Sequence, residues 1–141
     1  MHGVTFGTKH SYRTWGLWLK RRPEISPPTP KSKLIQVPGS NTVIDLTEAL
    51  TGGEVKYEPR TIRCEFCVIG GRSNWPSVYS AVLNEIHGKR MQIIMDDDPG
   101  YYYEGRVAVE QWESDEVTAT IVVTAKVNPY KTAINGGGEM L

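Results

Sequence analysis

The sequence contains few of the residues on which catalysis and metal binding most often depend. Its 141 residues include only two cysteines and three histidines, and none of the patterns G-x-S-x-G, H-E-x-x-H or the phosphate-binding P-loop occurs. No run of about 18 apolar residues is present, which excludes a membrane-spanning helix. The first residues, MHGVTFGTKHS, lack the apolar segment of a secretory signal. We therefore expect a protein that is not an enzyme, needs no metal or cofactor, and folds in a cytoplasm.

The two cysteines form the pattern C-x-x-C at Cys64 and Cys67, which also occurs in redox and zinc sites. Redox pairs of this kind begin a helix, whereas RTIRCEFCVIG alternates apolar and polar residues as a strand does. Successive strand side chains point to opposite faces, so a spacing of three separates the two sulfur atoms. We predict that Cys64 lies in the core and Cys67 on the other face.

Charge is balanced overall but unevenly distributed. The chain has 16 basic and 16 acidic residues, yet residues 1–33 contain seven Lys or Arg side chains against one Glu. This segment has a surplus of six positive charges, and the remainder has the matching six negative charges. Three interpretations are open: a solvated basic surface, a nucleic-acid contact, or a basic edge that meets an acidic edge of a neighbouring copy in a head-to-tail ring.

Alternation of apolar and polar residues predicts a largely antiparallel sheet. The pattern occurs in four segments: RTIRCEFCVIG, RMQIIMD, YYYEGRVAVEQW and VTATIVVTAKV, the last with an apolar face from Val117 to Val127. One segment, SNWPSVYSAVLNEIHGK, instead has the spacing of a helix, with Ser73 or Asn74 as its cap and Gly88 at its end. The fold class is therefore α+β, mainly β: a β-sandwich-like domain with one flanking helix at about residues 74–87.

A proline-rich excursion, PEISPPTPKSK, interrupts the first half of the chain. The segments KLIQVPG and NTVIDLT that follow it can pair as a projecting hairpin across residues 38–41. This hairpin has little core of its own, so its apolar side chains need a partner surface. The candidate protomer-interface residues are Ile35, Val37, Val43, Ile44 and Leu46.

The stretch MDDDPGYYYEG, from Met95 to Gly105, contains three consecutive aspartates. A calcium loop needs alternating oxygen ligands, and adjacent aspartates in an extended chain alternate in direction. Asp, Pro and Gly are the residues that a tight connection between two strands requires. We predict a hairpin turn, with an ion site and a partner-facing acidic patch as the alternatives.

Four segments between residues 2 and 131 occur in the order seen in one family of phage proteins: GVTFGTKHSYRTWGLWL, IQVPGSNTVIDLTEALTGGEVKYEPRTI, LNEIHGKRMQIIMDDDPGYYYEGRV and VNPYK. They resemble the distal tail proteins of siphophages and their prophage relatives, the Dit family. The resemblance implies that residues 1–131 form a tail-tube-type ring domain, usually hexameric, with residues 27–59 as an arm or belt on the neighbouring protomer. Only ten residues follow Lys131, so we expect 132–141 to be a flexible linker and the galectin-like second domain of the family to be absent.

The function implied by the resemblance is structural: a ring hub that joins the tail tube to the baseplate or tail tip and lets DNA pass through its lumen. Its partners would be further copies of itself, the tail-tube protein and tail-tip proteins, in a virion assembled in the bacterial cytoplasm. Two alternatives are open, a tail-tube protein that stacks into filaments and a carbohydrate-binding module with Tyr102 and Trp112 on the polar face of one strand. A small enzyme would need an acid pair within Asp96–Asp98 and Glu104.

Overall fold

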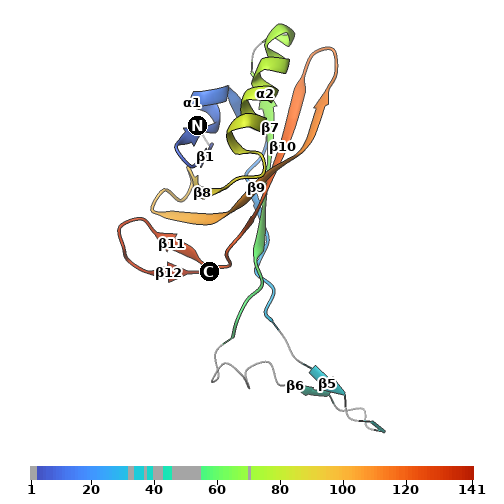
Figure 1. Ribbon diagram of the computed structural model, residues 1–141, viewed down its shortest axis with the longest axis vertical. Helices are drawn as coiled ribbons and strands as arrows, with labels where there is room; N and C mark the ends of the chain where they lie inside the picture. The colour runs from blue at the N-terminus through green and yellow to red at the C-terminus, as the bar shows by residue number, and fades with distance from the viewer. Residues whose placement is uncertain (1–2, 32–33, 37, 40–42, 46–54, 70) are drawn as a thin grey trace.

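The computed structural model describes residues 3–31, 34–36, 38–39, 43–45, 55–69 and 71–141. Every strand pair in these residues is antiparallel, and most strands belong to one curled sheet of order β2-β1-β8-β9-β10-β7-β3 (Figure 1). The predicted fold class, mainly β with one flanking helix, is confirmed. The strands of this order are β1 (Val4–Phe6), β2 (Lys9–His10), β3 (Leu17–Leu19), β7 (Arg60–Val68), β8 (Arg90–Met95), β9 (Tyr101–Ser114) and β10 (Ala119–Val127).

Helix α2 (Trp75–Ile86) is the helix predicted from the periodic segment. Its residues Trp75, Val82 and Ile86 are buried against the sheet, as the helical spacing requires. The predicted cap differs, because the Asn74 side chain makes no capping hydrogen bond and a 3-10 turn (Arg72–Asn74) leads into the helix. Gly88 follows the helix with φ +77°, the left-handed conformation that suits glycine.

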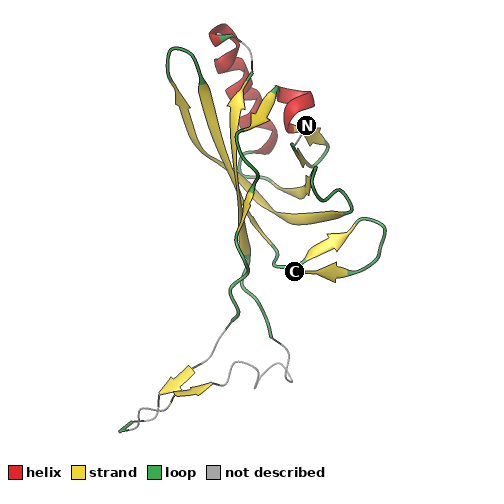
Figure 2. Cartoon of the chain, turned by 180° about the vertical axis from the view of Figure 1, so that it is seen from behind, coloured by secondary structure: helices red, strands yellow, loops and turns green. Residues whose placement is uncertain are grey.

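A second, short helix was not predicted. Helix α1 (Ser11–Trp15) has only five residues, too few to show a helical period in the sequence. The His10 Nδ1 atom accepts hydrogen bonds from the Tyr12 and Arg13 N–H groups (3.2 and 3.3 Å), which caps this helix. Both helices lie together at one end of the sheet (Figure 2), and together with its inner face they enclose the core.

The predicted strand faces are largely confirmed. The four inward residues of β7 are all buried: Ile62, Cys64, Phe66 and Val68. Cys64 and Cys67 are free thiols, and burial raises the pKa of the Cys64 thiol to about 12, so it stays protonated at neutral pH. The prediction for Val117 is wrong, because β10 begins at Ala119 and Val117 lies in the β9–β10 turn with 82% of its surface exposed.

The C-terminal residues form a hairpin where we expected a flexible linker. Strand β11 (Lys131–Ala133) pairs with β12 (Glu139–Met140) and also with the start of β9, where Ala133 lies opposite Tyr101. Ala133 is buried, and Gly136 and Gly138 adopt positive φ in the turn between β11 and β12. The glycines that suggested a linker therefore supply the turn of a hairpin.

The two segments predicted to pair as a projecting hairpin do so, away from the sheet, and we call this hairpin the arm. Strands β5 (Leu34–Gln36) and β6 (Val43–Asp45) pair antiparallel at the end of the molecule opposite α2 (Figure 1). Strand β4 (Glu24–Ile25) pairs with β7, and beyond it the two chain segments stay together. The Lys31 N–H donates to the Lys56 carbonyl (2.7 Å) and the Glu58 N–H donates to the Thr29 carbonyl (2.7 Å).

Candidate functional site

The aspartate-rich stretch is a turn between two strands, as predicted. Strand β8 ends at Met95 and β9 begins at Tyr101. The Asp98 N–H donates to the Met95 carbonyl (3.0 Å), and the Tyr101 N–H donates to the Asp98 carbonyl (3.3 Å). These bonds close the chain on itself between the strands, so the three carboxylates lie on one hydrogen-bonded turn.

Each carboxylate of this turn pairs with a cationic or hydrogen-bonding side chain from a different part of the chain. Asp96 accepts a hydrogen bond from His10 Nε2 (2.9 Å), just before α1. Asp97 lies 3.6 Å from Arg22 Nε in the segment after β3. Asp98 pairs with Lys131 Nζ (2.6 Å) at the start of β11. The turn therefore joins the N-terminal region, the β3–β4 segment and the C-terminal hairpin, a structural role that the sequence alone did not predict.

The electrostatics agree with a structural role for the Asp98–Lys131 pair. The hydrogen bond from Lys131 to Asp98 raises the pKa of Lys131 above its ordinary value, because it favours the charged amine. The Lys131 amine also lies 4.7 Å from the centre of the Tyr101 ring. Both interactions hold β11 against the turn and the first residue of β9.

The aspartates do not converge on a common point, as an acid pair or an ion site would require. Among the described residues, no group of three His, Cys, Asp or Glu side chains is arranged to hold a metal ion. Glu104, the other acid considered for catalysis, points to Arg90, whose Nε lies 3.4 Å from the Glu104 Oε1 atom.

Part of the basic N-terminal segment is neutralised within the same chain. Arg21 lies 3.0 Å from Glu65 on β7 and 3.7 Å from Glu24, and Arg22 pairs with Asp97. The interpretation of residues 1–33 as a free basic edge therefore needs correction at these two arginines, whose side chains are exposed but paired.

The proposed aromatic platform for sugars does not exist as predicted. Simple alternation predicts that Tyr102 and Trp112 share one face, but β9 has a bulge between Val109 and Gln111, opposite Val123 and Val122. The extra residue shifts Trp112 to the inner face, opposite the buried Ile121. There its ring stacks on Tyr79 of α2, with ring centres 4.6 Å apart. Trp112 therefore anchors the helix to the sheet.

Of the predicted interface residues, Ile35, Val43 and Ile44 lie on the described strands of the arm. Ile35 is directly opposite Ile44, and Gln36 is opposite Val43. Val37 and Leu46 lie outside the described residues. The base of the arm is held by an isolated bridge between Pro30 and Tyr57, and the Tyr57 ring packs edge-on against Tyr130, with ring centres 6.1 Å apart.

No sequence signal could have revealed the contacts of the aspartate turn. His10 and Asp96 are 86 residues apart, and Asp98 and Lys131 are 33 apart. Residues that pair over such separations follow no fixed spacing in the sequence, so the pairs become visible only in the folded structure. The exposed apolar residues of the C-terminal hairpin, Ile134 and Met140, were likewise missed because the segment was assigned to a linker.

Neither the protein-family profiles nor the curated protein sequences give a match to this chain. Among solved structures, the chain is similar to the Dit protein of phage SPP1, described as a paradigm of the hub adsorption apparatus in phages that infect Gram-positive bacteria. The TM-score is 0.71 at 11% sequence identity, and the match covers 94% of this chain and 52% of the SPP1 chain. The chain thus spans about half the length of that protein. Over nearly all of its length, the protein has a Dit-like fold.

Proposed function

We propose that the protein is a structural component of a phage tail, a ring-forming hub that joins the tail tube to the baseplate or tail tip. The observation that supports this proposal most directly is the likeness to the SPP1 hub protein over 94% of the chain. One fold can serve many functions, so the proposal depends on a test of assembly rather than on the fold alone.

The arm supports an assembly function independently of that likeness. Strands β5 and β6 have three residues each and pair only with one another among the described residues. An isolated two-stranded hairpin is marginally stable in water. In a head-to-tail ring, each copy offers one surface and accepts another. We infer that the arm packs on a neighbouring copy through Ile35, Val37, Val43, Ile44 and Leu46, in a homohexamer.

The proposed partners follow from the position of such a ring in a tail. One face would meet the tail-tube protein and the other would meet tail-tip or baseplate proteins, while DNA passes transiently through the lumen. The protein would be assembled in the bacterial cytoplasm and reside in the virion. No membrane partner is proposed, and none of the helices in the described residues has the length and apolarity that a membrane span requires.

Native mass spectrometry of the purified chain at micromolar concentration, with negative-stain images, tests the proposal. A species of six copies with a central hole is the expected result. Tubes of variable length would instead identify a tail-tube protein. A chain that stays monomeric alone and also fails to join its tail-tube and tail-tip neighbours, when these are co-expressed, would overturn the hub function.

A further inference from the structure

Three cationic side chains lie side by side across the centre of the sheet. Arg90 on β8 is directly opposite Arg106 on β9, and Arg106 is directly opposite Lys126 on β10. Directly opposed residues of antiparallel strands point to the same face, with Cβ atoms about 5 Å apart. All three side chains are exposed on the face away from the core. We call Arg90, Arg106 and Lys126 the basic row.

The basic row is only partly neutralised within the chain. Arg90 Nε lies 3.4 Å from Glu104, and Arg106 Nη1 donates to the uncharged Gly88 carbonyl (2.7 Å). Lys126 has no ion pair among the described residues. Like charges directly opposite one another destabilise a sheet, so the row costs stability unless an anionic partner covers it.

The opposite charge is concentrated at the tip of the β9–β10 hairpin, formed by residues 113–118 with the sequence ESDEVT. We call Glu113, Asp115 and Glu116 the acidic tip. Asp115 organises the loop, because its Oδ1 atom accepts the N–H groups of Val117 (2.7 Å) and Thr118 (2.6 Å). Those hydrogen bonds, above all the one from Thr118, keep the pKa of Asp115 below its ordinary value, so the tip stays charged.

The other two carboxylates of the acidic tip remain available to a partner. Glu113 accepts a hydrogen bond from the uncharged Gln111 amide, and Glu116 is exposed. Lys20 and Arg72 line hollows beside the tip, and Lys20 contributes to lowering the pKa of Asp115, but these two positive charges face three negative ones. The tip is therefore a net anionic projection with the exposed Val117 at its end.

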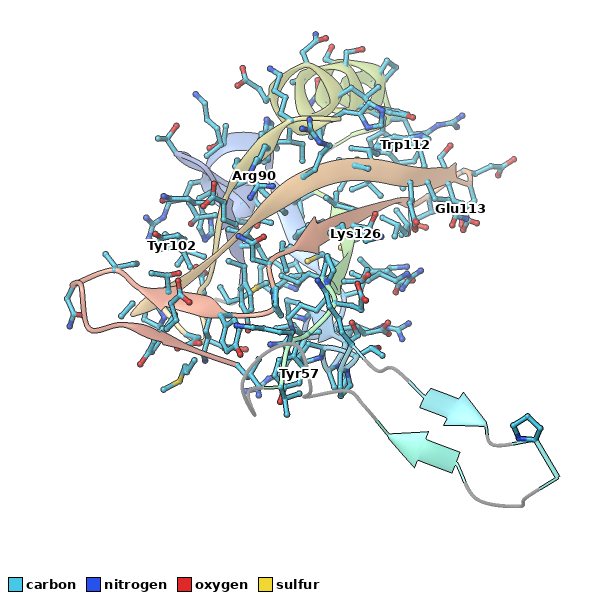
Figure 3. The ribbon with its side chains drawn as sticks, turned by 60° about the horizontal axis from the view of Figure 1, so that its bottom comes forward. Tyr57, Arg90, Tyr102, Trp112, Glu113 and Lys126 are labelled. Atoms are coloured by element: carbon cyan, nitrogen blue, oxygen red, sulfur yellow. The ribbon has the colours of Figure 1, made fainter. Side chains whose placement is uncertain are left out.

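The acidic tip cannot reach the basic row of its own chain. Glu113 and Arg106 lie opposite Thr120 and Lys126 of β10, six residues apart on that strand, which corresponds to about 20 Å at 3.3 Å per residue. Figure 3 shows Glu113 near the far end of β9, away from Arg90 and Lys126. This separation exceeds the Debye length of about 8 Å at physiological salt, so the two groups do not neutralise each other within one copy.

We propose that the acidic tip of one copy docks on the basic row of a second copy, as the polar contact between protomers. Three carboxylates on a compact loop match three cations spaced about 5 Å apart across neighbouring strands. The contact is heterologous, so each copy uses both surfaces. The inference rests on the proposed function, because both require the chain to associate with copies of itself. The contact is distinct from the one proposed for the arm.

Charge-reversed variants test this contact. The row variant carries Arg106→Glu and Lys126→Glu, and the tip variant carries Glu113→Lys and Glu116→Lys. Sedimentation equilibrium in low salt should show that each variant alone self-associates at least about tenfold more weakly than the wild type, because like charges then meet. An equimolar mixture of the two variants should regain the wild-type association, since each reversed surface finds its complement in the other protein.

Matched controls separate this contact from a general effect of net charge. The variant Glu85→Lys/Glu139→Lys has the same charge change as the tip variant at exposed positions elsewhere, and it should associate as the wild type does. Circular dichroism checks that all variants fold. Failure of the mixture to regain association, or a wild-type chain that is monomeric at millimolar concentration, would overturn the proposal.

The remaining outcomes distinguish this proposal from its competitors and from the hub function. A row variant that associates normally but loses binding to a short DNA duplex would identify a nucleic-acid surface and overturn the proposal. Six-copy rings that persist in both variants would also overturn it while leaving the hub function intact. If the mixture of the two variants regains association but forms assemblies other than rings, the result would support the contact and contradict the hub function.

Discussion

At Gly105 the backbones of β9 and β10 approach so closely that a side chain cannot fit between them. A Cβ atom at this position would lie 2.1 Å from the Lys126 carbonyl oxygen and 2.5 Å from the Val127 Cα atom. Both neighbours are backbone atoms of a central strand, so neither can move aside as a flexible side chain could. Glycine in a strand often marks such an approach, and here it lies next to Arg106 of the basic row.

The substitution Gly105→Ala should therefore lower the free energy of unfolding by about 2–3 kcal/mol, the cost of overpacking a rigid interior. Urea denaturation followed by circular dichroism measures this change. Gly100→Ala is the matched control, because a Cβ there meets no atom within 4 Å. Equal denaturation midpoints for the two variants would show that β9 and β10 can move apart at this point without lowering the free energy of unfolding.

At the scale of elements, the C-terminal hairpin depends on the pair between Lys131 and Asp98. The folded-state pKa of Lys131 is raised above its ordinary value of 10.5, so the pair contributes its full stability below that pH. The contribution is lost as the pH rises through the raised pKa. Side-chain exposures of 18% for Lys131 and 37% for Asp98 limit the effect to about 1 kcal/mol or less.

Lys131→Met keeps the apolar stem and removes the charge. We expect the variant to unfold more easily than the wild type by up to about 1 kcal/mol at neutral pH, with a difference that shrinks above pH 10.5. Comparing the two proteins by urea denaturation at each pH cancels the titration of groups that they share. Asp98→Asn should have the same effect, without adding to it in the double variant. If the difference in unfolding free energy between the two proteins stays constant into the alkaline range, the charge of Lys131 does not contribute to stability.

The elements also differ in how well local sequence predicted them. Helix α2 and the inward faces of β7 and β8 were predicted correctly, because a repeated period over many residues reports which side is buried. Trp112 was placed on the wrong face because one bulge in β9 interrupts the alternation, and no residue type announces a bulge. The C-terminal hairpin was missed because glycines favour both linkers and turns, and its pairing partner lies some thirty residues away.

At the scale of the whole molecule, charge pairs over long sequence distances hold the chain together where the candidate site was expected. The aspartate turn contacts His10, Arg22 and Lys131, which belong to three regions of the chain. Some of the positive charges in residues 1–33 therefore pair with negative charges elsewhere in the same copy. The proposed contact between copies uses other charges, those of the basic row and the acidic tip, neither of which was evident from the sequence.

The arm is the part of the molecule whose stability should depend most on assembly. Its strands lie away from the core, and its register places Ile35 opposite Ile44. Replacing Ile35, Val37, Val43 and Ile44 by alanine, with or without Leu46, removes apolar area that a neighbouring copy would cover. A minority of interface side chains contribute more than about 1 kcal/mol each, and two anchors of about 1.4 kcal/mol among these residues are enough to raise the dissociation constant of the assembly about 100-fold.

Native mass spectrometry of this arm variant should therefore show monomers under conditions in which the wild type forms its ring. The fold itself should persist, since the core cluster contains no residue of the arm among those described. The control variant Ile69→Ala/Ile134→Ala removes exposed apolar side chains elsewhere and should leave the ring intact. An arm variant that still forms rings of wild-type stability would show that other surfaces make the contact between protomers. The next surfaces to test would be the acidic tip and the basic row, by reversing their charges.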